Sequence, residues 1–519
     1  MKESSRTANT FKNMVISLIL YAISYVAVFI SRTFFVRILG NDYLSISGLF
    51  TNVITLVSFT ELGLGSASVF CLYQPIADKD YIKIRSLLSF FGNLYKGVAL
   101  ITLVLGGILI PFLPYLVDME DMSFTHHYLI VVYMLFIINT SASYIFVQKK
   151  LFLTADQKNY IANTIQQTVH IIQLVIQTLF LVFTHNYIGY LIIQIICTII
   201  TNVVISKYVE RKYRELLSSK NIYPIEKNEK KNIAQNIGSI FFYKIGAVIL
   251  NGTDNIIVSV FVKTIFVGLC SNYTLVINAI NSVIMQCFNG IGASIGNHTI
   301  NAAKEEQEKV FCQLDIFCVV VYSFCSVCLA VLLNRLIFNW FGKDYLLSQV
   351  TVLSLVLAFY VTGVNQIPSL YRTSLGLFKN ARFFPLLAAI SNIVLSIILS
   401  KVMGLSGVFW ATSIVRFLFF TLVDSRLTYV KGFEMSPIKY YVKYLYRVIV
   451  LVVTYFLVEN ILKLISISSM SIGELILHTC ICVCITALCL LAAYSWNEEF
   501  KLLLKRLKVF IKPERMKMR

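Results

Sequence analysis

Two charged side chains lie inside an apolar stretch of membrane-spanning length, residues 241–262 (FFYKIGAVILNGTDNIIVSVFV): Lys244 and Asp254. A charge at the centre of a bilayer costs roughly 2.5–3.5 kcal/mol on insertion scales. On one helix the two charges would be about 15 Å apart, which is too far for mutual neutralisation. Each therefore needs another partner. Two interpretations stay open: a polar pathway inside a helix bundle, or side chains that snorkel to opposite interfaces.

Three more basic residues occur within apolar segments: Arg32, Lys96 and Arg416. Arg32 and Lys96 are nearer the segment ends, where snorkelling costs little, whereas Arg416 is close to mid-depth. The deep carboxylates are Glu61 and Asp254. A surplus of cations within the spans predicts an anionic ligand such as a lipid phosphate, which arginine binds through paired hydrogen bonds.

Glu61 occurs in the segment FTELGLGSASVF, whose small residues allow helices to approach one another closely. Its carboxylate can pair with an intramembrane cation such as Arg32 or Lys96. It can equally be a partly hydrated residue at the membrane interface.

A polar stripe runs along the apolar segment 161–184. Its members are Gln166, His170, Gln173 and Gln177. Spacings of four, three and four residues keep all of them on one helical face, and such a face does not point into lipid. The stripe is either hydrogen-bonding contact between helices or the wall of a wet pathway, and both interpretations stay open.

The composition excludes a soluble domain. The chain has 519 residues, of which 57% are hydrophobic and 14% charged, and its mean hydropathy is +0.76. Apolar runs of about 20 residues recur from end to end, which is typical of a helical membrane protein and not of a β-barrel. The net charge of +19 is expected to follow cytoplasmic loops and does not indicate nucleic acid. The twelve cysteines fall mostly within apolar runs and predict neither disulfides nor a metal site.

We predict an all-α polytopic membrane protein with about fourteen transmembrane helices in two six-helix lobes plus two C-terminal helices, both termini being cytoplasmic. The predicted spans are 13–36, 44–71, 88–110, 127–148, 161–184, 187–206, 237–262, 265–290, 311–334, 346–368, 380–400, 404–423, 445–463 and 472–494. With this topology thirty-five Lys and Arg residues lie inside and six outside, as the positive-inside rule requires.

The predicted domains follow from these spans. They are an N-terminal lobe (1–206), a basic cytoplasmic linker (207–236), a C-terminal lobe (237–423), two further helices (424–494) and a basic tail (495–519). The tail is either an amphipathic helix on the anionic inner leaflet or a solvated segment.

The same layout argues against an enzyme. The outer loops are short and the linker is too small for a nucleotide-binding domain. The sequence contains no P-loop, paired-carboxylate or His-rich metal motif. A membrane polysaccharide polymerase or ligase is therefore the less favoured alternative, because it would need a sizeable outer loop. A multidrug or organic-cation antiporter is the other alternative, and it predicts an acidic cavity.

Four segments resemble the oligosaccharide flippases, the polysaccharide-transporter branch of the multidrug, oligosaccharidyl-lipid and polysaccharide exporter superfamily. They are SRTFFVRILG (31–40), ELGLGSASVFCLYQPIA (61–77), LFLTADQKNYI (151–161) and NGTDNIIVSVFVKTIFVGLCSNYTLV (251–276). The resemblance implies a two-lobed bundle with a cationic cavity. Such a protein moves polyprenyl-pyrophosphate-linked oligosaccharide from the inner to the outer leaflet by alternating access.

By this resemblance, Arg32 and Arg37 correspond to the arginines of the family's first span, and Asp254 to the aspartate of its TD-II motif. No dense arginine cluster lines the spans, which departs from related flippases. The predicted location is the bacterial cytoplasmic membrane and the predicted role is synthesis of a capsule, teichoic acid or exopolysaccharide.

The predicted site combines both lines of reasoning. The predicted substrate-binding residues are Arg32, Arg37, Lys96, Lys244, Arg416, Gln166, His170, Gln173 and Gln177. Asp254 or Glu61 is predicted to couple transport to a proton or sodium gradient, with no cofactor and no metal. The expected partners are the lipid-linked oligosaccharide, membrane lipids, a polysaccharide polymerase and glycosyltransferases, but no nucleic acid.

Overall fold

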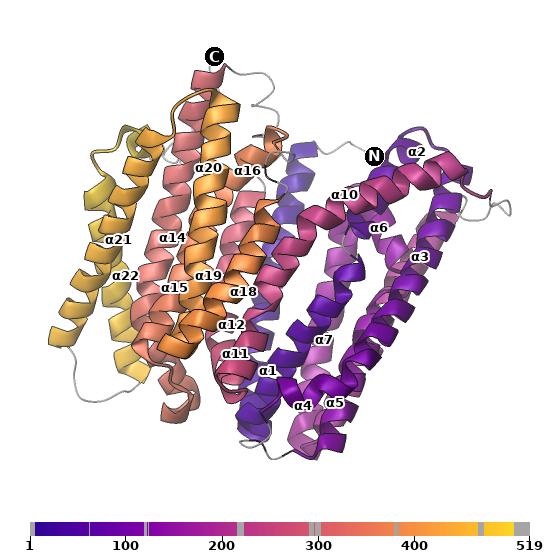
Figure 1. Ribbon diagram of the computed structural model, residues 1–519, viewed down its shortest axis with the longest axis horizontal. Helices are drawn as coiled ribbons and strands as arrows, with labels where there is room; N and C mark the ends of the chain where they lie inside the picture. Colours follow the sequence, from indigo (N-terminus) through magenta and orange to yellow (C-terminus); the bar gives the residue numbers. More distant parts are fainter. Residues whose placement is uncertain are drawn as a thin grey trace. The chain divides into compact units, whose positions relative to one another are not determined.

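The computed structural model describes residues 6–61, 63–118, 122, 124–214, 223–289, 295, 303–377, 381, 383–465 and 472–502. All regular elements within these residues are helices (Figure 1). Eleven of these helices are long and apolar enough to cross a membrane, or up to twelve if the bent pair α5 and α6 counts as one span. The chain is therefore an all-helical multi-pass membrane protein.

The chain forms two compact units, Met1–Ser271 and Asn272–Arg519. In the first unit the long helices α1, α3, α5, α7 and α8 run side by side, and α10 crosses obliquely beside α2 (Figure 1). Its helices are α1 (Arg6–Val57), α2 (Leu64–Ala77), α3 (Tyr81–Ile108), α4 (Leu113–Leu116), α5 (His126–Ser143), α6 (Val147–Ala155), α7 (Asn159–Thr184), α8 (Tyr187–Lys212), α10 (Lys227–Gly252), α11 (Asp254–Phe261) and the first residues of α12 (Ile265–Asn289).

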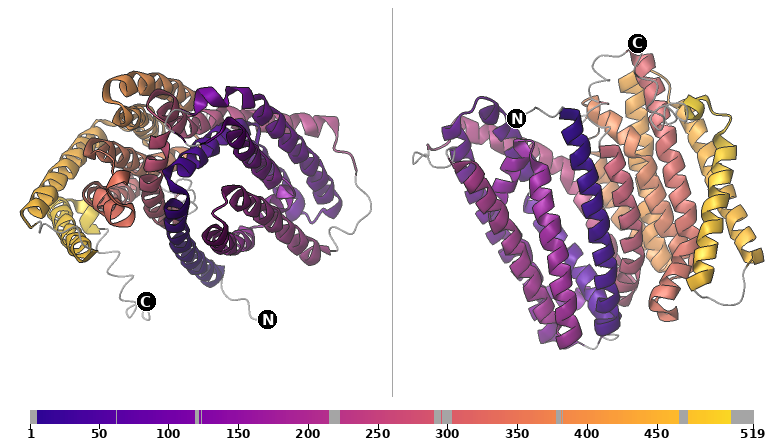
Figure 2. Two further views of the ribbon diagram at one scale, coloured as in Figure 1. Left: turned by 90° about the horizontal axis from the view of Figure 1, so that it is seen from below. Right: turned by 180° about the vertical axis from the view of Figure 1, so that it is seen from behind.

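The second unit is organised around the long helix α14, which packs against α15, α21 and α22 (Figure 2). Its helices after α12 are α14 (Lys304–Phe341), α15 (Gln349–Val364), α16 (Gln366–Ser374), α18 (Phe384–Met403), α19 (Leu405–Arg416), α20 (Leu422–Leu427), α21 (Ile438–Ile465) and α22 (Ile472–Tyr494). Two π-helical turns, Phe417–Thr421 and Thr428–Phe433, follow α19 and α20, so these elements form one continuous span.

Two features account for eleven or twelve spanning helices where fourteen spans were predicted: α1 is counted as one helix, and the apolar helix Ile245–Phe261 within the predicted span 237–262 is too short to be counted. The predicted spans 13–36 and 44–71 share α1, which breaks at Gly40 with φ 83° and ψ −173°. These dihedrals are non-helical and favour glycine. A 3₁₀ turn at Ser58–Glu61 then separates α1 from α2, so the prediction of a continuous span 44–71 is wrong. The count of fourteen and the sidedness of the loops remain predictions.

Two predicted segments, the linker 207–236 and the tail 495–519, overlap described helices and also extend into residues that the structure does not describe. The predicted linker 207–236 contains the end of α8, at Lys212, and the beginning of α10, at Lys227. Residues 215–222 of the linker lie outside the described residues. The amphipathic helix predicted in the tail 495–519 falls mostly on residues 503–519, which also lie outside the described part.

Candidate functional site

Arg32 lies on α1 within the first unit. Its side chain is half-buried, and its Nη1 donates a hydrogen bond to Ser271 Oγ at 3.2 Å. Tyr187 and Tyr190 on α8 lie near the guanidinium. The guanidinium is thus directed to neighbouring helices of its own unit, in a setting of hydroxyl groups.

Hydrogen bonds from the polar stripe on α7 reach both neighbouring helices. His170 Nδ1 lies 3.3 Å from Ser24 Oγ on α1, with the donor set by the histidine tautomer. Gln177 is 1% exposed, and its Nε2 donates to the Tyr190 carbonyl at the start of α8 at 2.9 Å. Gln173 Nε2 donates to Gln177 Oε1 at 3.1 Å, and Gln166 is half-buried. These bonds favour the interpretation of the stripe as contact between helices.

Arg416 is the last residue of α19 and belongs to the second unit. Its Nη1 donates to Thr362 Oγ1 on α15 at 2.7 Å, and the side chain is half-buried. A hydroxyl group therefore accepts a hydrogen bond from each of the two arginines, Arg32 in the first unit and Arg416 in the second.

Arg37, Lys96 and Lys244 are the other basic residues predicted to bind the substrate. Arg37 on α1 and Lys96 on α3 are exposed. Lys244 belongs to α10, but its side chain lies outside the described residues. The sequence places Lys244 and Asp254 in one apolar segment, and in the structure α10 ends at Gly252 and α11 begins at Asp254, with Thr253 between them in right-handed helical geometry (φ −89°, ψ −25°).

The two predicted coupling carboxylates lie at helix boundaries of the first unit. Asp254 is in the first turn of α11, where the helix dipole stabilises a negative charge. Glu61 ends the 3₁₀ turn after α1, is half-buried, and interacts electrostatically with Lys150, Tyr95 and Tyr144. The structure therefore adds Lys150 to the cations considered as partners of Glu61.

Gly252, at the end of α10, packs closely against α1. A Cβ atom on Gly252 would lie 2.8 Å from Leu56 Cδ2 on α1. We expect Gly252→Val to lower the free energy of unfolding by about 1–3 kcal/mol, because overpacking a close helix contact costs that much. Gly238→Val is the matched control, because no atom lies within 4 Å of a Cβ built at Gly238 on the same helix. Equal thermal unfolding midpoints of the two purified variants would contradict this account.

The ADQK segment forms a polar clamp between α6, α7 and α8. Lys158 Nζ lies 2.6 Å from Asp156 Oδ2 and donates to the Tyr213 hydroxyl at 2.8 Å, while Tyr213 donates to Asp156. Burial lowers the pKa of Lys158, but the bonds to Asp156 and Tyr213 outweigh it and the net pKa is raised. Burial and the bond to Asp156 raise the pKa of Tyr213 to about 12. The motif is therefore a structural link at the ends of these helices.

We expect Tyr213→Phe to destabilise the protein by about 1 kcal/mol, because it removes bonds to two partly exposed charged groups. A group with a raised folded-state pKa contributes its full stability below its ordinary pKa and loses it only as the pH rises further. The difference in unfolding midpoint between wild type and Tyr213→Phe should thus stay constant between about pH 7 and 9. A midpoint shift no larger than that of Tyr223→Phe, at an exposed tyrosine, would argue against the clamp.

Two buried ion pairs of the second unit were not predicted from the sequence. Arg447 Nη1 lies 2.6 Å from Asp315 Oδ2, and Arg372 Nε lies 2.9 Å from Asp424 Oδ1. All four side chains are at most 6% exposed. Each arginine is neutralised by an aspartate inside the helix bundle, a pairing that the charge count did not predict. Asp315 within the predicted span 311–334 was the signal that could have revealed one pair.

No protein-family model matches the chain, and no curated protein sequence matches it significantly. Solved structures do match. The lipid II flippase MurJ in an inward closed conformation superposes with a TM-score of 0.66 at 16% identity, over 93% of this chain and 99% of its own. An inward-facing multidrug resistance MATE family transporter of the MOP superfamily has a TM-score of 0.57 at 13% identity, over 79% of this chain and 95% of its own. This chain has the fold of MOP superfamily transporters.

A further multidrug transporter has the same fold. The MATE transporter DinF-BH, in complex with R6G, has a TM-score of 0.56 at 17% identity, over 81% of this chain and 96% of its own. These structural neighbours are transporters and not enzymes. The MOP fold agrees with the superfamily to which the sequence resemblance pointed, while the polysaccharide-transporter branch remains a prediction. Identities this low determine the fold and leave the substrate open.

Proposed function

We propose that this protein is a flippase that moves a polyprenyl-(di)phosphate-linked oligosaccharide across the cytoplasmic membrane by alternating access, for cell-surface polysaccharide synthesis. The observation that carries the proposal is the structural match to a lipid II flippase over 93% of the chain. The MATE multidrug transporters match a smaller share, 79% and 81%. The resemblance of four sequence segments to oligosaccharide flippases adds support, because it does not depend on the structural match.

The partners of the arginine side chains support a phosphate-binding role for Arg32. Arg372 and Arg447 are each neutralised by an aspartate, so they serve the packing of the second unit. Arg32 donates instead to the neutral hydroxyl of Ser271, which leaves its charge available to an anion. Guanidinium groups bind phosphate oxygens by paired, charge-assisted hydrogen bonds. We propose a phosphate-binding role for Arg416 as well, because it lies close to mid-depth in its predicted span and its Nη1 donates to the Thr362 hydroxyl.

Energy coupling forms a separate part of the proposal. Asp254 and Glu61 are the proposed coupling groups, because a carboxylate near a helix end can exchange a proton or hold a cation. Transport should then depend on a proton or sodium gradient and weaken in Asp254→Asn. Equal transport rates with and without both gradients would remove this part and leave the flippase proposal standing.

The alternative function is that of a multidrug antiporter, and the match to the DinF-BH complex with R6G favours it. Ligand-dependent thermal stabilisation of the purified full-length protein separates the two. A flippase should be stabilised by a polyprenyl-diphosphate-linked oligosaccharide and not by R6G, since a ligand that binds the folded state raises the unfolding midpoint. Stabilisation by R6G alone would favour the antiporter.

A further inference from the structure

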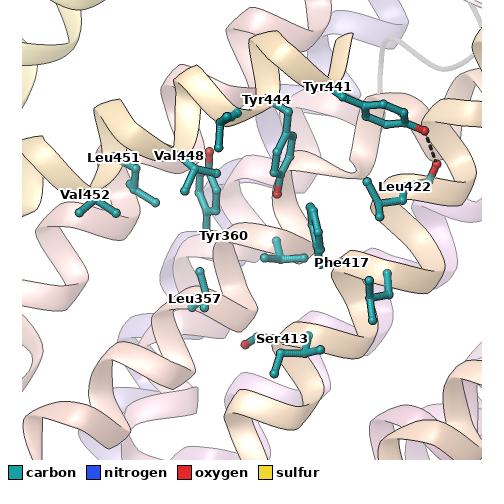
Figure 3. A pocket seen from close by; sticks show the side chains of 14 residues that line it. Leu357, Tyr360, Ser413, Phe417, Leu422, Tyr441, Tyr444, Val448, Leu451 and Val452 are labelled. Atoms are coloured by element: carbon teal, nitrogen blue, oxygen red, sulfur yellow. Dashed lines mark hydrogen bonds between the residues drawn. The ribbon is translucent and has the colours of Figure 1, made fainter. Parts of the chain in front are cut away.

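A pocket of roughly 440 Å³ lies in the second unit between α15, the span formed by α19 and α20, and α21 (Figure 3). Leu357 and Tyr360 come from α15, Ser413 and Phe417 from the middle span, and Val448 from α21. Its volume is within the roughly 300–1,000 Å³ range of ligand-binding sites. None of the arginines and carboxylates discussed above lines this pocket.

The chemistry of the wall fits a hydrocarbon chain. Most lining residues are aliphatic or aromatic, and two of the polar side chains, Ser413 and Tyr441, already donate hydrogen bonds to backbone carbonyls. Ser413 Oγ donates to the Phe409 carbonyl at 2.8 Å, and the Tyr441 hydroxyl donates to the Leu422 carbonyl at 3.0 Å (Figure 3). A polar ligand would therefore find few hydrogen-bond partners in this wall. An alkyl chain makes no hydrogen bonds with water, so its burial in the pocket leaves no polar group unsatisfied.

The pocket opens on a surface within the membrane-spanning segments. Leu418 and Leu445 line it and are 46% and 62% exposed, and both belong to candidate spans. Its wall on α21 extends from Tyr441 to Val452, about 16 Å at the helical rise of about 1.5 Å per residue. The π-helical turn Phe417–Thr421 displaces side chains from the regular helical pattern at this point, as such turns often do at functional sites.

Positive charge gathers at one end of the pocket. Arg426 lies one helical turn beyond Leu422, which lines that end, and it is exposed. Lys439 is exposed in the first turn of α21, which also begins at this end with its positive dipole. In the described part of the chain neither side chain pairs with a carboxylate. An apolar slot with cations at one end matches a lipid with an anionic headgroup.

We propose that this pocket binds an anionic glycerophospholipid of the membrane, with one acyl chain in the pocket and the headgroup phosphate at Arg426 and Lys439. This site goes beyond the proposed transport function and does not depend on the transported substrate.

Native mass spectrometry of the full-length protein tests the site with dioleoylphosphatidylglycerol and dioleoylphosphatidylcholine as probes. Wild type should bind the anionic lipid at least five-fold better. Val448→Trp fills the pocket and should lower this binding at least five-fold, with the smaller Val448→Phe intermediate. Ile449→Trp should bind like wild type, because Ile449 is 53% exposed and does not line the pocket.

The headgroup contacts are tested with Arg426→Gln combined with Lys439→Gln. This double variant should reduce the preference for phosphatidylglycerol to less than two-fold, while Lys401→Gln, at an exposed lysine on α18, should retain it. Wild-type binding without headgroup preference, or unchanged phosphatidylglycerol binding in Val448→Trp, overturns the proposal. A Val448→Trp variant that loses binding of a polyprenyl phosphate but keeps phosphatidylglycerol also overturns it, because the pocket would then hold an isoprenoid chain.

Discussion

Replacing Arg447 with methionine is expected to lower the free energy of unfolding by about 3–5 kcal/mol, because the change leaves the carboxylate of Asp315 buried without its partner. Arg447 and Asp315 are 6% and 1% exposed, and their charged atoms lie 2.6 Å apart. The guanidinium also lies over the ring of Tyr440, with 5.6 Å between Cζ and the ring centroid. The unfolding midpoint of the purified protein measures this effect.

Two further variants make the test specific. Lys463→Met removes an exposed partner of Glu459 on the same helix and should cost less than about 1 kcal/mol. The double variant Arg447→Met with Asp315→Leu removes both charges and should recover most of the lost stability, since an apolar pair can replace a buried ion pair. If Arg447→Met unfolds at the same temperature as Lys463→Met, the buried pair is not a major contributor to stability.

We expect Arg32→Gln to reduce transport of lipid-linked oligosaccharide by about 10- to 100-fold. The physical reason is the loss of charge-assisted hydrogen bonds to phosphate, worth about 1.5–3 kcal/mol, at a factor of ten for each 1.4 kcal/mol. The measurement is the initial rate at which labelled lipid-linked oligosaccharide becomes accessible at the outer leaflet of proteoliposomes, at matched protein amounts.

The control for Arg32 is Lys207→Gln. Lys207 is an exposed cation on α8, so its replacement tests whether any loss of positive charge slows transport. Its rate should stay within about two-fold of wild type. A normal rate in Arg32→Gln would remove Arg32 from the substrate site, while the same loss in both variants would indicate a general effect of surface charge.

Properties that depend on local composition could be predicted from the sequence. The long apolar runs correctly indicated a helical membrane protein, because a spanning helix must satisfy its backbone hydrogen bonds internally. The spacing of the stripe on α7 correctly indicated one shared face, since Gln173 and Gln177 bond to each other. Its role could not be chosen from sequence, because the acceptor of Gln177 is the Tyr190 carbonyl of another helix.

Features that depend on tertiary contacts or exact backbone geometry were beyond the sequence. Asp315 and Arg447 are 132 residues apart, so neither hydropathy nor periodicity relates them. The break at Gly40 occurs within an apolar segment, where a sliding average does not register a single glycine.

The measurement that tests the central claim most directly is the appearance of a labelled polyprenyl-diphosphate-linked oligosaccharide at the outer leaflet of proteoliposomes that contain the wild-type protein. Protein-free vesicles of the same lipid composition are the control. The flippase proposal predicts a rate at least ten-fold above that control, with no uptake of R6G. Movement of R6G with a lipid-linked oligosaccharide rate equal to that of protein-free vesicles would contradict it.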